Sequence, residues 1–185
     1  MNTADQDELI RTAQGGDGQA FAQLLADYYD TIYRFAYRWC GNKADAEDTT
    51  QLACIKLAQT ISQFRFEAAF SSWLYRLVIN CAKDWHKSQN RHQHDNIEEW
   101  IEPELAPDRR AENSIYLQQL LRLLDHMAEG FKETALLVHG EGLNHAEAAA
   151  ILQVKESTVS WRLHEIRKQL QLLQQQPDGS WELSL

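Results

Sequence analysis

The chain is patterned for helices along most of its length. Apolar residues recur every three or four positions, which is the period of a helix with one buried face. Glycine-rich breaks at residues 15–18 and at Gly41 separate the segments, because glycine ends a helix readily. Four helices are therefore expected in the first half, at about 5–14, 17–40, 43–62 and 67–90.

The second half begins with a polar connector that contains Pro103 and Pro107, roughly residues 91–110. With only three prolines and eight glycines in 185 residues, the pattern predicts an all-α protein. Helices are expected to resume at about 111–127 and 131–139, and two more follow before a turn signal at 177–179. We therefore expect two small helical domains, at 1–90 and 112–173. A flexible linker at 91–111 joins them, and a tail follows at 174–185.

Residues 142–173 carry the pattern of a helix-turn-helix. Asn144 is placed to cap a first helix, and Glu147 lies where it returns the hydrogen bond. A turn is expected at Gln153 and Val154. The second helix has apolar residues at steps of four, three, four and three, namely Val159, Leu163, Ile166, Leu170 and Leu173. A motif of this kind places its second helix in the major groove of DNA.

The opposite side of that second helix is polar apart from one ring. At about 100° per residue, four side chains point away from the apolar stripe, namely Ser157, Trp161, His164 and Lys168. Arg162 and Arg167 flank the stripe on either side. An ordinary amphipathic helix with a solvated face is the alternative. An outward tryptophan favours a nucleic-acid or protein partner, because such a ring is uncommon on a free surface.

Residues 43–62 combine acidic and apolar side chains on one predicted face. The helix dipole alone explains three acids near a helix N-terminus. It does not explain why Leu52 and Ile55 share a face with Asp45, Asp48 and Gln51, opposite the apolar stripe of the same helix. An outward face of this composition is typical of a docking surface for a basic partner helix.

Residues 64–85 contain six of the eighteen aromatic residues of the chain. Arg65, Arg76 and Lys83 are interleaved with these rings. Rings stack on unpaired bases while cations hold phosphates, so the mixture suits single-stranded nucleic acid. An aromatic core is the alternative, and we expect it for at least half of the rings. Asn80 lies in an apolar helix, where its amide either reads a base edge or is simply exposed.

The net charge of −9 disfavours strong binding to DNA, but the charge is unevenly distributed. Residues 1–91 hold ten Lys and Arg against eleven Asp and Glu, and residues 92–185 hold eight against sixteen. Much of the excess acid falls in the connector. Such a chain is expected to bind DNA weakly alone and to need a larger assembly.

Other features of the sequence exclude several classes of protein. No run of about 18 apolar residues predicts a membrane span, and the acidic N-terminus is unlike a signal peptide, so a cytoplasmic protein is expected. The three cysteines are expected to be small core residues. The histidines at 86, 92 and 94 lack cysteine partners, and no metal site or cofactor is predicted. No nucleotide-binding, zinc-protease or serine-hydrolase motif is present, so no catalytic residue and no enzyme activity is predicted.

Three segments together resemble one known family. DAEDTTQ, FSSWLYRLVINCAKDW and EGLNHAEAAAILQVKESTVSWRLHEIRKQL occur in the order and spacing found in extracytoplasmic-function (group IV) sigma factors of the sigma-70 family of bacterial RNA polymerase. The resemblance covers almost everything from residue 17 to residue 173. It implies that residues 1–90 are sigma region 2, which binds the polymerase clamp helices and melts the −10 promoter element. It also implies that residues 112–173 are region 4, which binds the −35 element and the polymerase flap.

The resemblance assigns roles to particular residues. Those expected to bind core polymerase are Asp45, Glu47, Asp48, Gln51, Leu52 and Ile55. Those expected to bind −10 DNA, with the loop 62–67 capturing a flipped base, are Phe64, Arg65, Phe66, Trp73, Arg76, Asn80 and Lys83. Those expected to bind −35 DNA are Ser157, Thr158, Ser160, Trp161, Arg162, His164, Arg167 and Lys168. An anti-sigma factor or another regulator is a further expected partner.

The chain also departs from the family pattern. The arginine cluster usual after the melting helix is replaced by HKSQNRHQH, and Glu165 stands where the recognition helix usually has an arginine. Fewer cations mean fewer phosphate contacts, so an unusual −35 sequence is expected. The tail is longer than the family requires, and its Trp181, Leu183 and Leu185 are expected to dock onto the second domain or between the domains. A frayed end or a cloning remnant without a role is the alternative. The alternative function is a helix-turn-helix regulator that binds duplex DNA without polymerase.

Overall fold

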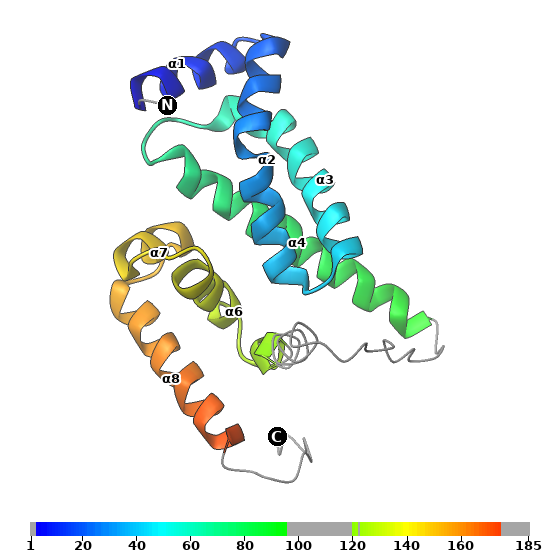
Figure 1. Ribbon diagram of the computed structural model, residues 1–185, viewed down its shortest axis with the longest axis vertical. Helices are drawn as coiled ribbons and strands as arrows, with labels where there is room; N and C mark the ends of the chain where they lie inside the picture. The colour runs from blue at the N-terminus through cyan, green and yellow to red at the C-terminus, as the bar shows by residue number, and fades with distance from the viewer. Residues whose placement is uncertain (1–2, 96–119, 122, 175–185) are drawn as a thin grey trace, which may run out of the picture.

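Helices α1–α4 form the N-terminal half of the computed structural model, which describes residues 3–95, 120–121 and 123–174 (Figure 1). Their bounds are Thr3–Gln14 for α1, Gly18–Cys40 for α2, Lys43–Thr60 for α3 and Phe70–Asp95 for α4. A short 3₁₀ turn at Ile61–Gln63 follows α3. The regular elements within the described residues are all helical, which confirms the predicted all-α class.

The fourth predicted helix differs most from the observed one. The helix predicted at 67–90 begins three residues later and continues to Asp95, so the first residues of the predicted linker are helical. The polar residues beyond position 85 lack an apolar stripe, but lysine, glutamine and arginine propagate a helix well in water. The rest of the predicted linker, residues 96–119, and the predicted tail from 175 lie outside the described residues.

Local capping explains where α2 begins and ends. The Asp17 carboxylate accepts hydrogen bonds from the backbone N–H groups of Gln19, at 2.8 Å, and Ala20, at 3.0 Å. These bonds satisfy N–H groups that have no partner within the helix. At the other end Gly41 adopts a left-handed φ of 74°, and its N–H bonds the Tyr37 carbonyl at 2.9 Å. The predicted break at Gly41 is therefore a glycine C-cap.

The N-terminal core lies where α2 packs along α3 and against α4. Its largest fully buried side chains include Leu24 and Phe35 of α2, Leu57 of α3 and Leu74 of α4. The apolar stripe expected on residues 43–62 is confirmed, because Ala53 and Leu57 are completely buried. The packing leaves the opposite side of α3 facing outward.

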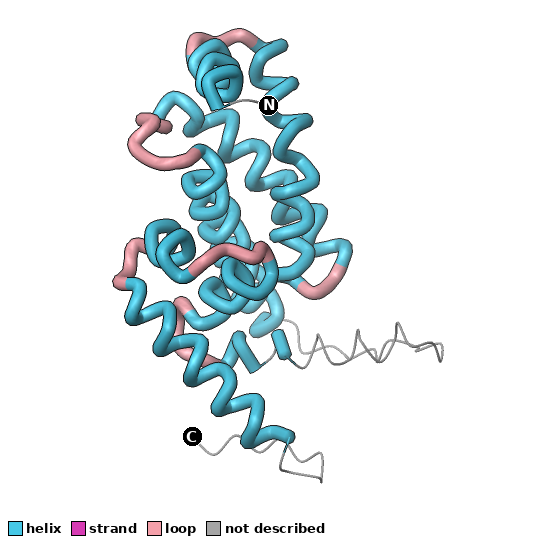
Figure 2. Tube along the Cα trace, turned by 60° about the vertical axis from the view of Figure 1, so that its left-hand side comes forward, coloured by secondary structure: helices cyan, strands magenta, loops and turns pink. Residues whose placement is uncertain are grey.

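The C-terminal half is a compact set of short helices followed by a long one (Figure 2). Residues 120, 121 and 123–126 are helical, and then come α6, at Phe131–Ala135, and a π-helical turn at Leu136–Gly140. The helix-turn-helix consists of α7, at His145–Leu152, and α8, at Glu156–Gln174. The predicted capping box is confirmed, with the Asn144 side chain accepting from the Glu147 N–H at 2.9 Å and Glu147 accepting from the Asn144 N–H at 2.8 Å.

The two halves are in contact rather than separate. Their buried apolar side chains form one cluster, in which α4 lies against α7 and α2 lies against the π-helical turn. Close packing is also visible at Gly41, where an added Cβ atom would lie 2.8 Å from the Leu121 side chain. Helix α8 extends away from α1–α4 along the outer edge of the molecule (Figures 1 and 2). Within the described residues, no helix is long and apolar enough to cross a membrane.

Candidate nucleic-acid interface

The outer side of α3 carries the face expected to dock on a partner. Asp48 and Gln51 are exposed, and Leu52 and Ile55 are 40% and 55% exposed despite being large and apolar. We call these four residues the docking face. Glu47 is also exposed and lies 3.6 Å from Lys43, one helical turn before it. Exposed acids beside exposed leucine and isoleucine have the composition of an interface rather than of a solvated helix face.

Asp45 differs from the other residues predicted for core binding. Its side chain is half-buried and accepts hydrogen bonds from Asn42 Nδ2, at 2.8 Å, and from Trp85 Nε1 of α4, at 3.3 Å. The expectation that Asp45 shares the free outward face is therefore wrong. This carboxylate instead ties the start of α3 to α4, which the helical wheel of α3 alone does not reveal.

Most rings of the aromatic segment pack on one another. Phe64 is only 6% exposed and contacts Phe70, edge to face, and Trp73 at ring-centroid distances of 5.3 and 5.6 Å. Phe66 has a positive φ of 59° and lies beneath the Arg11 guanidinium, 3.9 Å from the ring centroid. The prediction that Phe64 binds DNA is not supported by its burial. Phe64 instead packs against both Phe66 and Trp73 and supports their rings.

A pocket of about 200 Å³ opens beside this cluster. We call it the Trp73 pocket, and it is lined by Gln63, Phe64, Arg65, Glu67, Ala68, Ser72, Trp73, Arg76 and Ala150. The loop expected to capture a base and the helix expected to melt DNA thus meet at one site. A half-buried tryptophan beside two arginines provides a stacking surface and positive charge.

A larger groove of about 370 Å³ runs between α3 and α4. It brings Leu52 and Ile55 of the docking face to the same opening as Trp73, Arg76 and the exposed Asn80. The residues predicted for core binding and for −10 binding are therefore adjacent, although they lie on different helices.

The outward side of α8 is arranged largely as predicted. Val159 and Leu163 are buried against the rest of the helix-turn-helix, and Ser157, His164, Arg167 and Lys168 are exposed. Thr158 is half-buried, and Ser160 is exposed and lies 2.9 Å from His145 Nδ1 of α7. Lys168 lies 3.6 Å from Glu165, which reduces the positive charge this surface offers to phosphates.

Trp161 and Arg162 are more constrained than expected. Trp161 is 55% exposed, but its ring packs edge to face on Phe131 at 5.3 Å. The Arg162 guanidinium folds onto Gly130, with hydrogen bonds to the Thr134 hydroxyl at 3.4 Å and the Glu129 carbonyl at 3.5 Å. The guanidinium is therefore turned toward α6, and the contact of Arg162 with −35 DNA stays a prediction. Gly130 leaves room for the guanidinium because it has no side chain.

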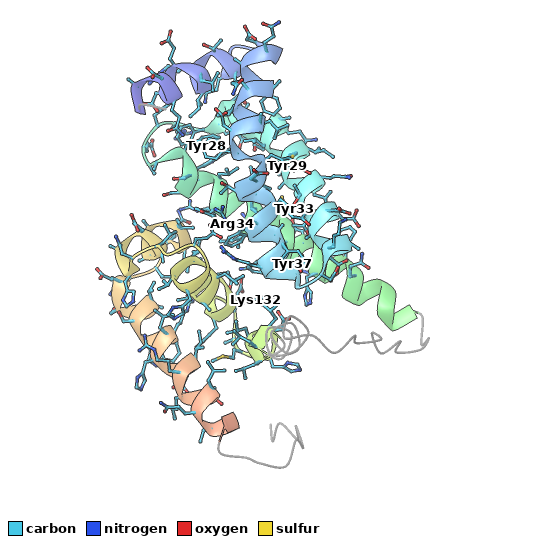
Figure 3. The ribbon with its side chains drawn as sticks, in the orientation of Figure 1. Tyr28, Tyr29, Tyr33, Arg34, Tyr37 and Lys132 are labelled. Carbon is cyan, nitrogen blue, oxygen red and sulfur yellow. The ribbon has the colours of Figure 1, made fainter. Side chains whose placement is uncertain are left out.

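Glu141 forms an ionic centre between the two halves that the sequence pattern did not suggest. Its side chain is 2% exposed and accepts hydrogen bonds from Arg34, at 3.0 Å, from Arg38 and from the Tyr75 hydroxyl, at 2.8 Å. Figure 3 shows Arg34 on the side of α2 that faces the C-terminal helices. The partners lie 66 to 107 residues from Glu141 in the chain, so local periodicity carried no signal for it.

The pKa values at this centre follow from burial and charge. Burial opposes ionisation of Glu141, but hydrogen bonds from Arg34 and Tyr75 and the charges of Arg34 and Arg38 outweigh it and lower the pKa of Glu141. Burial, followed by the hydrogen bond to Glu141, raises the pKa of Tyr75 to about 12. Glu141 is therefore held as a carboxylate and Tyr75 as a phenol that donates to it.

Two cations predicted to bind −10 DNA are occupied by the C-terminal half. Lys83 of α4 lies 2.7 Å from Glu129 and 2.6 Å from Glu133, whose side chain is 4% exposed. Arg76 donates from Nε to the Ile151 carbonyl and from Nη2 to the Ala150 carbonyl, both at 3.0 Å. These carbonyls belong to the last turn of α7, the negative end of the helix dipole.

Comparison with known proteins finds relatives among the sigma factors of RNA polymerase. Residues 24–92 match the family model of sigma-70 region 2. The ECF RNA polymerase sigma factor SigE of Mycolicibacterium smegmatis is 31% identical over 152 residues, 80% of this chain but only 59% of that longer protein. The RNA polymerase sigma-H factor of Pseudomonas aeruginosa is 28% identical over 180 residues, which cover 91% of this chain and 93% of that protein.

Solved structures show the same fold at low sequence identity. CnrH, solved in complex with the cytosolic domain of CnrY, has a TM-score of 0.64 at 21% identity, with 90% of this chain and 94% of that one covered. The sigma factor RpoE of Bartonella quintana, solved with the anti-sigma factor NepR, has a TM-score of 0.62 at 23% identity, with 85% and 98% covered. The fold and the matched region define a protein of the sigma-70 class. Within that class, the chain belongs to the extracytoplasmic-function sigma factors.

Proposed function

We propose that this protein is an alternative sigma factor that binds core RNA polymerase and directs initiation at particular promoters. The observation that carries the proposal is the docking face, where Asp48, Leu52 and Ile55 are exposed on a helix inside the matched sigma-70 region 2. Exposed acids surrounding apolar side chains suit a partner surface that is basic and partly apolar, and the clamp helices of polymerase are the proposed partner.

The proposed −10 site is the Trp73 pocket together with the neighbouring α4 surface. A flipped base stacks on the exposed part of Trp73, while Arg65 holds the adjoining phosphate. Asn80 is exposed in the adjacent groove between α3 and α4, where its amide reaches a base edge. Phe64 lines the pocket and packs against both Phe66 and Trp73, so it supports the stacking ring.

The proposed −35 site is the exposed side of α8. His164, Arg167 and Lys168 reach the duplex, and Ser157 and Ser160 lie nearer the N-terminal end of the helix, where phosphates bind. Trp161 offers an apolar contact, which suits a thymine methyl group and does not suit the bidentate guanine contact made by arginine. The preferred −35 sequence should therefore differ from one read by a more basic helix.

A regulatory protein partner is also proposed. The two solved relatives with the same fold were each captured with a partner, the cytosolic domain of CnrY and the anti-sigma factor NepR. An anti-sigma factor that covers the docking face would block core binding directly. The proposal gives the protein no catalytic step of its own.

The test measures core binding by fluorescence anisotropy with labelled full-length protein and purified bacterial core polymerase. Wild type should bind, and Asp48→Arg should lose binding, because like charges across an interface cost several kcal/mol. Glu8→Arg is the matched control, since Glu8 is an exposed acid on α1, a helix that is not part of the docking face. Wild-type affinity of Asp48→Arg for core, with unchanged circular dichroism, would overturn the docking face. Duplex binding without any core binding would favour a stand-alone regulator.

A further inference from the structure

Beside the apolar cluster that joins the two halves, their contact contains ionic and polar pairs that mostly share one direction of charge. The C-terminal half supplies carboxylates and helix carbonyls, and the N-terminal half supplies the cations. Glu141 meets Arg34 and Arg38, Glu129 and Glu133 meet Lys83, and the α7 carbonyls meet Arg76. This matches the uneven charge of the sequence, in which the second half carries most of the excess acid.

The pairing occupies the groups proposed to hold −10 DNA. Both charged residues predicted for the melting helix, Arg76 and Lys83, are bonded to the C-terminal half. The Trp73 pocket is partly closed by Ala150 of α7, which lines it. Phosphates of a promoter strand need the same guanidinium and ammonium groups, so DNA and the C-terminal half cannot both have them.

Two carboxylates of the ionic pairs between the two halves are shielded from water. The carboxylates of Glu141 and Glu133 have side chains only 2% and 4% exposed, and each is satisfied by cations. Lys132 adds to the contact, since its ammonium lies 5.0 Å from the centroid of the Trp39 ring of α2 (Figure 3). Such shielded pairs are screened by salt much less than surface pairs.

Two other surfaces remain open in the same arrangement. The docking face stays exposed, with Leu52 40% and Ile55 55% accessible. The outward side of α8, with Trp161 and His164, is likewise exposed. The contact is therefore selective, because it engages Arg76 and Lys83 of the proposed −10 site and leaves the proposed polymerase-binding and −35 surfaces accessible.

We propose that the contact centred on Glu141 is autoinhibitory, with the acidic C-terminal half occupying the −10 site in place of promoter phosphates. The free protein is then closed, and single-stranded DNA binds only the fraction that is open. The apparent affinity for such DNA is reduced by that fraction. This inference rests on the proposed sigma function, since it assumes that the Trp73 pocket binds −10 DNA.

The test uses the full chain as wild type, as Glu141→Gln, and as the charge exchange Arg38→Glu with Glu141→Arg. Glu8→Gln on α1 is the control for the loss of one acid. Each variant is measured by small-angle scattering, for its radius of gyration, and by anisotropy with a single-stranded oligonucleotide carrying a −10 element. Core binding is measured in parallel, and circular dichroism checks that each variant is folded.

Glu141→Gln should expand the protein and strengthen oligonucleotide binding about tenfold or more, which is the effect of losing one charge-assisted hydrogen bond. The charge exchange should restore part of the compactness and of the weak binding, because Arg38→Glu pairs with Glu141→Arg while Arg34 opposes it. Glu8→Gln should match wild type. Compact Glu141→Gln protein, or expanded protein with wild-type oligonucleotide affinity, overturns the autoinhibitory contact. If all variants bind core but none binds the oligonucleotide, the −10 site and this inference fail together. If even wild type does not bind core, the proposed function fails.

Discussion

Replacing Trp161 with alanine separates its contribution to folding from its proposed contribution to DNA binding. Trp161 is 55% exposed, and a tryptophan can bury about 250 Å². The covered remainder is therefore roughly 110 Å², and at about 25 cal/mol per Å² its contact with Phe131 contributes at most about 3 kcal/mol. Because part of this surface is already covered in the unfolded chain, Trp161→Ala should lower the free energy of unfolding by about 1–2 kcal/mol.

The effect on DNA should be additional to that loss. If the exposed part of the ring contacts the −35 duplex, Trp161→Ala should weaken binding by about 1–3 kcal/mol, or roughly 5- to 150-fold. Urea unfolding gives the stability, and anisotropy with a duplex selected on wild type gives the affinity. His164→Ala is the control, since it removes an exposed side chain and should lower affinity without lowering stability. Reduced stability with wild-type duplex affinity would show that Trp161 only supports α6 and has no role in reading DNA.

Three further predictions concern the cap, the −10 site and pH. Asn144→Ala removes the bond to the Glu147 N–H and should cost about 1 kcal/mol in urea unfolding, and no change would contradict the cap's role. Asn80→Ala should impair open-complex formation in permanganate footprints while core affinity stays unchanged, and a wild-type footprint would exclude Asn80 from the −10 site. The pKa of Glu141 is lowered in the closed arrangement, so the carboxylate stabilises this arrangement fully above the ordinary glutamate pKa of about 4.3. That contribution is lost as the pH falls through the lowered pKa. Scattering should therefore show compact protein from pH 5 to pH 8 and expansion only at a pH below the ordinary glutamate pKa, and a Glu141→Gln variant that expands at the same pH as wild type would contradict the role of Glu141.

Local sequence rules predicted the helices and the helix-turn-helix because those depend on neighbours in the chain. The capping box at Asn144 and the buried positions Val159 and Leu163 follow from spacing alone, and the structure confirms them. The rules placed the end of α4 too early, because they equate the end of an apolar stripe with the end of a helix. The residues up to Asp95 are helical although no such stripe continues there.

The candidate site was less predictable because it depends on contacts between distant segments. A helical wheel gave the direction of Arg162 from α8, but it gave no sign that Gly130 would leave space for the guanidinium. Glu141 lies between two glycines and reads as a loop residue, yet it pairs with arginines more than 100 residues away. Phe64 was assigned to DNA by its motif, and only three-dimensional packing shows that it is buried.

Run-off transcription on genomic fragments tests the central claim most directly. Core polymerase is reconstituted with wild-type protein, with Asp48→Arg or with Glu8→Arg, and the transcript ends are mapped. Sigma activity predicts discrete start sites with the wild type and the Glu8 variant that are absent with core alone and lost with the Asp48 variant. Transcripts no different from those of core alone, from a protein that binds duplex DNA by itself, would contradict the account.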